Sequence, residues 1–142
     1  MKRKAFAVFA LASLLAGAFA VTSAFGRGDQ ASPASSATVN MSGAPPSFRF
    51  SQIPQTFRAG TVRFALRNSS SGQVRHNFTV YRVSGQSPAS LRLTRSFASR
   101  DLAAGQRQTL SRRLNAGFYV AVCTIGNGFH AANRMTTSFQ VQ

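Results

Sequence analysis

The segment CTIGNGFHAANRM, residues 123–135, decides how the rest of the chain is interpreted. It contains the only cysteine of the protein, Cys123, and His130 and Met135 follow that cysteine at short intervals. Apolar runs that are typical of β-strands lie immediately before and after the segment. We therefore expect a loop between two strands that presents a thiol, an imidazole and a thioether to one region of space.

The only other histidine, His76, lies in a third strand-like run, residues 75–80. Two imidazoles, one thiolate and a weak thioether form a donor set that suits copper cycling between Cu(I) and Cu(II). Taken singly, a cysteine or a methionine is more often part of a core, and a histidine is more often a hydrogen-bonded structural residue. The joint occurrence of both histidines, the cysteine and the methionine predicts a site for one copper ion that serves electron transfer.

The N-terminal residues 1–24 have the three parts of a secretory signal peptide. Basic residues 2–4 are followed by an apolar run, residues 5–21, and then by small residues that suit cleavage. The run is at the short end of the range for a bilayer span, so a retained membrane anchor is the alternative. We expect export to the periplasm, the cell surface or the extracellular space.

A single cysteine in an exported protein limits the kind of site. Exported domains of this size often use cysteines in pairs for disulfides, and a leftover thiol would be open to oxidation. Binding to a metal removes that liability, because the thiolate is then committed to the ion. One cysteine also excludes a dinuclear copper centre bridged by two thiolates, and any zinc or iron–sulfur site with four cysteines.

The remainder of the chain has the pattern of one all-β domain. Residues 25–37 are small and polar, and we expect a flexible linker there. Residues 38–142 show short alternating runs with turn residues between them and no helical stripe of ten or more residues. Strands are predicted at residues 37–42, 47–52, 61–68, 74–83, 91–97, 106–114, 118–123 and 136–141. This pattern indicates an antiparallel Greek-key β-sandwich of seven to eight strands. In the strand at 91–97, we expect Leu91, Leu93 and Phe97 to face the core.

The charge balance is strongly basic. Of the 17 lysines and arginines, three lie at residues 2–4, and the other 14 are all arginine. They are opposed only by Asp29 and Asp101, so the mature form carries about +12 by simple counting. Such a charge favours an acidic redox protein, or an anionic membrane or cell-wall surface, as partner. No nucleic-acid-binding motif is present and an exported protein rarely meets nucleic acid, so we exclude that partner, and we expect a monomer.

The segment LNAGFYVAVCT, residues 114–124, together with the later His130 and Met135, resembles the C-terminal signature of the cupredoxins, the plastocyanin and azurin family. The upstream RHNF, residues 75–78, is similar to the family's first ligand histidine with the asparagine that follows it. The resemblance covers about residues 38–142. It implies a blue (type 1) copper site and a cupredoxin-like sandwich.

The resemblance also implies a role for each matching residue. It implies that His76, Cys123 and His130 are strong copper ligands and that Met135 is a long axial ligand. Asn77 and Thr124 match positions whose hydrogen bonds tie the two ligand loops together. The loop departs from the family in three ways. Six residues separate the cysteine from the histidine, where plastocyanin and azurin have two or four. The usual proline is missing, and Arg134 stands where a glycine usually precedes the methionine.

The function that follows is an electron shuttle and not an enzyme, because the copper ion does the redox chemistry. One alternative is copper delivery or storage, which would use the same ligands in a more open site. Another is a metal-free sandwich that serves as an interaction module. A cysteine nucleophile activated by histidine has little support, since only Asn77 could orient the base. If electrons pass through the copper, we expect His130 to approach the surface inside a collar of apolar and small residues.

Overall fold

The computed structural model describes residues 34–142 apart from residues 86 and 88. The predicted signal peptide, residues 1–24, and most of the predicted linker lie outside the described residues. The described residues belong to one compact unit. Within the part that the structure describes, no helix is long and apolar enough to cross a membrane.

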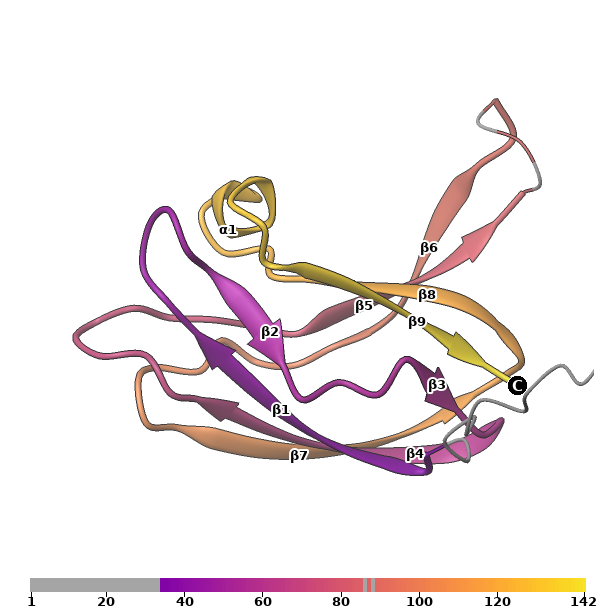
Figure 1. Cartoon of the computed structure of the whole chain (residues 1–142), viewed down its shortest axis with the longest axis horizontal. Helices are drawn as coiled ribbons and strands as arrows, with labels where there is room; N and C mark the ends of the chain where they lie inside the picture. Colours follow the sequence, from indigo (N-terminus) through magenta and orange to yellow (C-terminus); the bar gives the residue numbers. More distant parts are fainter. Residues whose placement is uncertain (1–33, 86, 88) are drawn as a thin grey trace, which may run out of the picture. The chain divides into compact units, whose positions relative to one another are not determined.

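The described chain folds into two β-sheets that face each other (Figure 1). One sheet has four strands, in the order β2 (Arg49–Ser51), β1 (Ser36–Ser42), β4 (Gly60–Asn68) and β7 (Arg107–Leu114). The other has five strands, in the order β3 (Thr56–Phe57), β9 (Thr136–Val141), β8 (Gly117–Val122), β5 (Thr79–Ser84) and β6 (Arg92–Ala98). The predicted all-β sandwich is confirmed. The described residues form nine strands instead of the predicted seven to eight, because the two-residue β3 is an additional strand that pairs with β9. The sandwich is also not entirely antiparallel, since the β1–β4 and β3–β9 pairs are parallel.

The ordered sandwich begins earlier than the sequence predicted. Ala34 bridges to Phe57, and β1 starts at Ser36 with Ala37 already buried. The predicted linker, residues 25–37, is therefore wrong at its C-terminal end. Composition favoured disorder for these small residues, but pairing with β4 gives their backbone groups partners that composition does not reveal.

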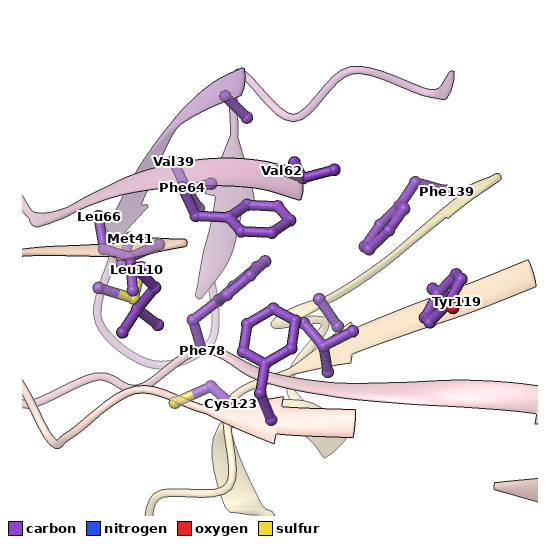
Figure 2. Close-up of a cluster of buried hydrophobic side chains, with 14 of the residues drawn as sticks. Val39, Met41, Val62, Phe64, Leu66, Phe78, Leu110, Tyr119, Cys123 and Phe139 are labelled. Atoms are coloured by element: carbon purple, nitrogen blue, oxygen red, sulfur yellow. The ribbon is translucent and has the colours of Figure 1, made fainter. Parts of the chain in front are cut away.

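Phenylalanine rings from both sheets form the centre of the core. Phe64 of β4 lies 5.6 Å from Phe57, 5.5 Å from Phe78 and 5.5 Å from Phe97, measured between ring centroids. Phe64 is fully buried, so its loss would cost about 3–5 kcal/mol. Cys123 belongs to the same buried cluster and lies at its edge (Figure 2). The candidate site is thus built directly on the core.

A β-bulge in the β5–β6 hairpin corrects one prediction about the core. Val80 pairs with Phe97, but the next residue, Tyr81, pairs with Arg95, so one residue of β6 is left over. Because side chains alternate along a strand, the extra residue turns the rest of β6 over. Phe97 faces the core as predicted, whereas Leu91 and Leu93 are 49% and 55% exposed. Alternation alone could not reveal the bulge.

Candidate metal centre

Three donor atoms from distant parts of the sequence meet at one end of the sandwich. The Nδ1 atoms of His76 and His130 lie 3.1 Å apart. The Sγ atom of Cys123 lies 3.4 Å from Nδ1 of His130 and 3.9 Å from Nδ1 of His76. All three side chains are buried. The structure therefore brings together the three residues that the resemblance gave as strong ligands.

Hydrogen bonds hold His76 through its backbone N–H and carbonyl and through its ring Nε2. It is not part of β5, which starts at Thr79, five residues later than the predicted strand at residues 74–83. Instead, its backbone forms an isolated antiparallel bridge with Leu102, through two hydrogen bonds of 3.0 and 2.8 Å. The ring Nε2 lies 2.8 Å from Ser70 Oγ.

Ser70 determines which nitrogen of His76 is free. Its hydroxyl donates to the carbonyl oxygen of Gly43 at 3.2 Å. A hydroxyl that donates there accepts from Nε2–H of His76, so the Nδ1 atom keeps its lone pair and points toward Cys123. Gly43 has a φ of 110°, and a Cβ atom there would collide with the Ser47 carbonyl, so the position requires glycine. This is the tautomer that a metal ion needs.

Cys123 follows directly after β8. Its backbone N–H donates to the Met135 carbonyl oxygen at 3.1 Å, which closes the loop between β8 and β9. Its sulfur accepts a hydrogen bond from the backbone N–H of Asn77 at 3.4 Å. A hydrogen bond of this kind stabilises the thiolate form and tunes the electron density on the sulfur.

The long Cys-to-His segment contains one short helix, α1 (Phe129–Ala132), which the sequence did not predict. Gly128 precedes it with a φ of 88°, and the N–H of Ala132 donates back to the Gly128 carbonyl at 2.9 Å. This turn takes up the extra residues and returns His130 to the cysteine. Arg134, which stands where the family has glycine, has a φ of 71°. The left-handed conformation explains why glycine suits that position.

Met135 is fully buried beside the two ligands on its own loop. Its backbone N–H donates to the His130 carbonyl oxygen at 2.9 Å, and its carbonyl accepts from Cys123. Its exposed fraction is 0%. The structure thus ties the backbone of the methionine to His130 and Cys123 and buries its side chain.

Asn77 joins the two ligand-bearing segments, as the resemblance implied. Its Oδ1 atom accepts from the Thr124 N–H at 2.8 Å, and its Nδ2 donates to Thr124 Oγ1 at 2.9 Å. The same Nδ2 donates to Asp101 Oδ1 at 2.9 Å. Asp101 provides the only carboxylate side chain among the described residues, and it lies against this junction.

Phe48, the residue just before β2, covers both histidines. Its ring stacks on the His130 imidazole, with 4.0 Å between centroids and 20° between planes. It also meets the His76 ring edge-on at 5.6 Å. Phe48 is 3% exposed, so it keeps water away from both imidazoles. Contacts with Phe48 and the hydrogen bonds of Ser70 fix the orientation of both rings.

Burial sets the protonation states of the three donors. It lowers the pKa of His76 to about 4, and the charge of the nearby His130 adds to that effect. Burial likewise lowers the pKa of His130. Burial raises the pKa of the Cys123 thiol, although the Asn77 N–H opposes this in part. At neutral pH both imidazoles are uncharged and able to bind a cation, while the thiol keeps its proton until a cation displaces it.

The donor set fits one kind of ion best. Two imidazole nitrogens and a thiolate with a thioether nearby suit copper in either oxidation state, and oxygen-seeking ions such as calcium and magnesium would find no oxygen ligands among these four side chains. The buried set of two histidines, a cysteine and a methionine is typical of a site for a single type 1 copper ion.

Sequence reasoning missed three contributors to the site: Phe48, Ser70 and Asp101. Phe48 was interpreted only as an alternating core residue, Ser70 lies in a serine-rich loop, and Asp101 counted only toward net charge. The one sequence signal that could have raised interest in Asp101 is the scarcity of acidic residues.

Comparison with known proteins gives similarity at the level of structure. No family model matches the chain, and no curated protein sequence matches it. Reduced auracyanin from the photosynthetic bacterium Roseiflexus castenholzii is 19% identical with a TM-score of 0.58, over 78% of this chain and 98% of that one.

Two further solved structures extend the likeness. Azurin Az-iso2 from Methylomonas sp. strain J is 10% identical with a TM-score of 0.55, over 75% of this chain and 97% of that one. Rusticyanin from Thiobacillus ferrooxidans is 17% identical with a TM-score of 0.51, over 76% of this chain and 78% of that one. These matches and the two-sheet sandwich show that the chain has the cupredoxin fold.

Proposed function

We propose that the protein binds one copper ion and shuttles single electrons between redox partners, without catalytic turnover of its own. The observation that carries this proposal is the convergence of two imidazole nitrogens and one thiol sulfur in a buried group. His76, Cys123 and His130 would hold the ion strongly and Met135 weakly. When bound, copper supplies the exchange of one electron between Cu(I) and Cu(II).

The surroundings of the donors suit electron exchange because they resist rearrangement. Ser70 and Phe48 fix the rings of the two histidines. Asn77 links the segment of His76 to the segment that carries the other ligands. A site whose ligands are held in advance changes little when the charge of the ion changes, so little reorganisation accompanies each electron.

Burial favours the shuttle over copper delivery or storage. Delivery needs ligands that an acceptor protein can reach. His76, Cys123 and Met135 have exposed fractions of 0%, and His130 has 8%. An ion enclosed in this way is retained and not handed over. The convergence of donors likewise argues against a metal-free interaction module.

His130 is the proposed entry point for electrons, since it alone of the four has measurable exposure. The next residue, Phe129, is 50% exposed beside it. An apolar surface at this point allows a partner to approach closely and then leave, which suits brief redox contacts.

Charge supports a proposal about the partner and its location. We infer that the protein is exported as a monomer and meets an acidic redox protein, drawn by an excess of arginine. Electron exchange with such a partner should slow steeply as salt rises, because screening shortens the reach of the charges. Stopped-flow rates at several ionic strengths measure this, and rates that do not change would show that the charge serves another purpose.

One experiment separates the shuttle from delivery. Copper-loaded protein is reduced and reoxidised repeatedly in the presence of a strong soluble Cu(I) chelator. We expect reversible one-electron voltammetry with the copper content unchanged. Rapid loss of Cu(I) to the chelator would favour delivery, and Phe48→Ala, which uncovers the His130 ring, should increase whatever loss occurs.

A further inference from the structure

We propose that the end of the five-stranded sheet farthest from the metal centre docks on an anionic lipid bilayer. The docking surface consists of Leu91 and Leu93 in the β5–β6 hairpin, with Val83 and Phe118 beside them. The hairpin extends beyond the rest of the sandwich, away from α1 (Figure 1). The inference does not depend on whether copper is bound.

Strand register gathers the apolar side chains on one face. Val83 pairs with Leu93 on one side and with Phe118 on the other, so the three form a row across β6, β5 and β8. Leu91, two positions before Leu93, falls on the same side by alternation. The β6 bulge is what turns both leucines outward.

The exposure of this row is unusual for the molecule. Phe118 is 62% exposed, more than any other large hydrophobic residue that the structure describes. Within the described residues, four large hydrophobic side chains are exposed, and three of them, Leu91, Leu93 and Phe118, lie here. The fourth is Phe129 at the metal centre. Scattered single residues need no explanation, but a register-aligned row does.

Arginines surround the row without acidic neighbours. Arg95 lies on the same outer face, paired with Tyr81. Arg82 and Arg92 project from the other side of the hairpin, and both are exposed. Asp101, which provides the only described carboxylate side chain, binds Asn77 at the opposite end of the sheet. The outer side of the hairpin is therefore apolar apart from Arg95, and Arg82 and Arg92 lie on its other side.

This chemistry matches the interface of an anionic membrane. Leucine and phenylalanine side chains gain free energy at the boundary of headgroups and acyl chains, and arginines reach the lipid phosphates. A second copy of the chain fits poorly, because docking through this face would bring Arg95 of both copies together.

The path of the chain supports the same occupant. Ala34, the first described residue, bridges to Phe57, which pairs with Val141. Val141 in turn pairs with Gly117, the neighbour of Phe118. The described chain therefore begins at the docking end of the sandwich, and the apolar run at residues 5–21 precedes it in sequence.

Docking in this way leaves the metal centre free. From Phe118, β8 runs five residues to Cys123, which is about 17 Å of strand. The loop with His130 would face away from the membrane and toward a soluble partner.

The test is cosedimentation with vesicles, using residues 31–142, because all nine strands and the four candidate ligands lie in that compact unit. Vesicles contain either phosphatidylcholine alone or equal parts phosphatidylcholine and phosphatidylglycerol. We expect binding to the mixed vesicles only. Leu93→Ser should lower the partition coefficient about tenfold. Circular dichroism verifies that each variant is folded.

A matched pair of charge variants separates this surface from net charge. Arg92→Gln with Arg95→Gln removes two charges from the hairpin that carries the docking surface. Arg67→Gln with Arg107→Gln removes two charges from an exposed cross-strand pair on the other sheet. We expect about a fivefold loss per arginine in the first variant and a much smaller loss in the second.

A reporter gives a second readout, because the chain contains no tryptophan. With Phe118→Trp, the emission should shift to shorter wavelength on mixed vesicles and stay unchanged on phosphatidylcholine. Equal losses from both arginine pairs, with no effect of Leu93→Ser and no shift at residue 118, would overturn the proposal in favour of general electrostatic attraction. Concentration-dependent dimers that Leu93→Ser makes monomeric, without vesicle binding, would overturn it in favour of a second copy.

Discussion

The two segments that form the metal centre are held in different ways. Residues 68–77 supply one histidine, and hydrogen bonds to other parts of the chain fix them: Asn68 to the Leu102 carbonyl, Ser70 to the Gly43 carbonyl, and the His76 backbone to Leu102. Residues 123–135 supply three candidate ligands and are held mainly by bonds within the loop. The scaffold positions one ligand, while the loop's own geometry positions the others.

This difference explains why the ligands of one segment are easier to recognise from the sequence than the ligand of the other. Close spacing made the cysteine, histidine and methionine visible as a group. His76 lies 47 residues before Cys123, and nothing local announces its partners. The hydrogen bonds between Asn77 and Thr124 form the junction between the two segments.

Breaking that junction should have the largest effect. Asn77→Ala leaves the Thr124 N–H and the Asp101 carboxylate without their partner, so we expect the free energy of unfolding to fall by about 2–4 kcal/mol. The copper absorption should also shift, because the two segments are no longer tied together. Chemical denaturation and the visible spectrum measure the two effects.

Asn68→Ala is the matched control for this variant. Asn68 is also buried and donates to the carbonyls of Val74 and Leu102, but its bonds lie on the His76 side alone. We expect a similar loss of stability with a smaller spectral shift. Equal spectral shifts in both variants would show that the junction has no special role.

Removing the support of His76 should have an intermediate effect. Ser70→Ala deletes the partner of Nε2, and we expect about 1 kcal/mol less stability and about tenfold weaker copper binding. Ser71→Ala, at an exposed neighbour, is the control and should change neither quantity. Unchanged copper affinity in Ser70→Ala, measured by competition with a chelator, would contradict the role given to the serine.

Exchanging the methionine should scarcely alter stability. Met135→Leu conserves volume, so we expect a cost below about 1.5 kcal/mol, and the same holds for the equally buried core residue Met41. Only Met135→Leu should raise the reduction potential, because a lost thioether donor no longer stabilises Cu(II). Equal potentials for Met135→Leu, Met41→Leu and the unmodified protein would exclude an axial role.

The smallest expected effect is the release of a proton when copper binds, which tests whether the Cys123 thiol of the loop is a ligand. Burial raises the pKa of the Cys123 thiol and lowers the pKa of His76 to about 4, so at neutral pH only the thiol must lose a proton. We expect about one proton released per copper ion, and weaker binding as pH falls. A pH indicator in weak buffer measures the release. Copper binding without proton release would show that the thiol is not a ligand.

The sequence predicted the sandwich and all four candidate ligands, because alternation and donor type are local properties. It did not predict that Leu91 and Leu93 face outward, since a single inserted residue on β6 decides this. Nor did it predict the stacking of Phe48 on His130, which joins residues 82 positions apart, one just before β2 and the other in α1. Contacts of this kind depend on how the sheets pack, and no local pattern records them.

The most direct test of the central claim is the visible spectrum of the protein with one equivalent of Cu(II). We predict an intense blue colour from charge transfer between thiolate and copper, present in the unmodified protein and absent in Cys123→Ser and His76→Ala. A Cu(II) complex of the unmodified protein that stays colourless, or a blue colour that survives Cys123→Ser, would contradict the account.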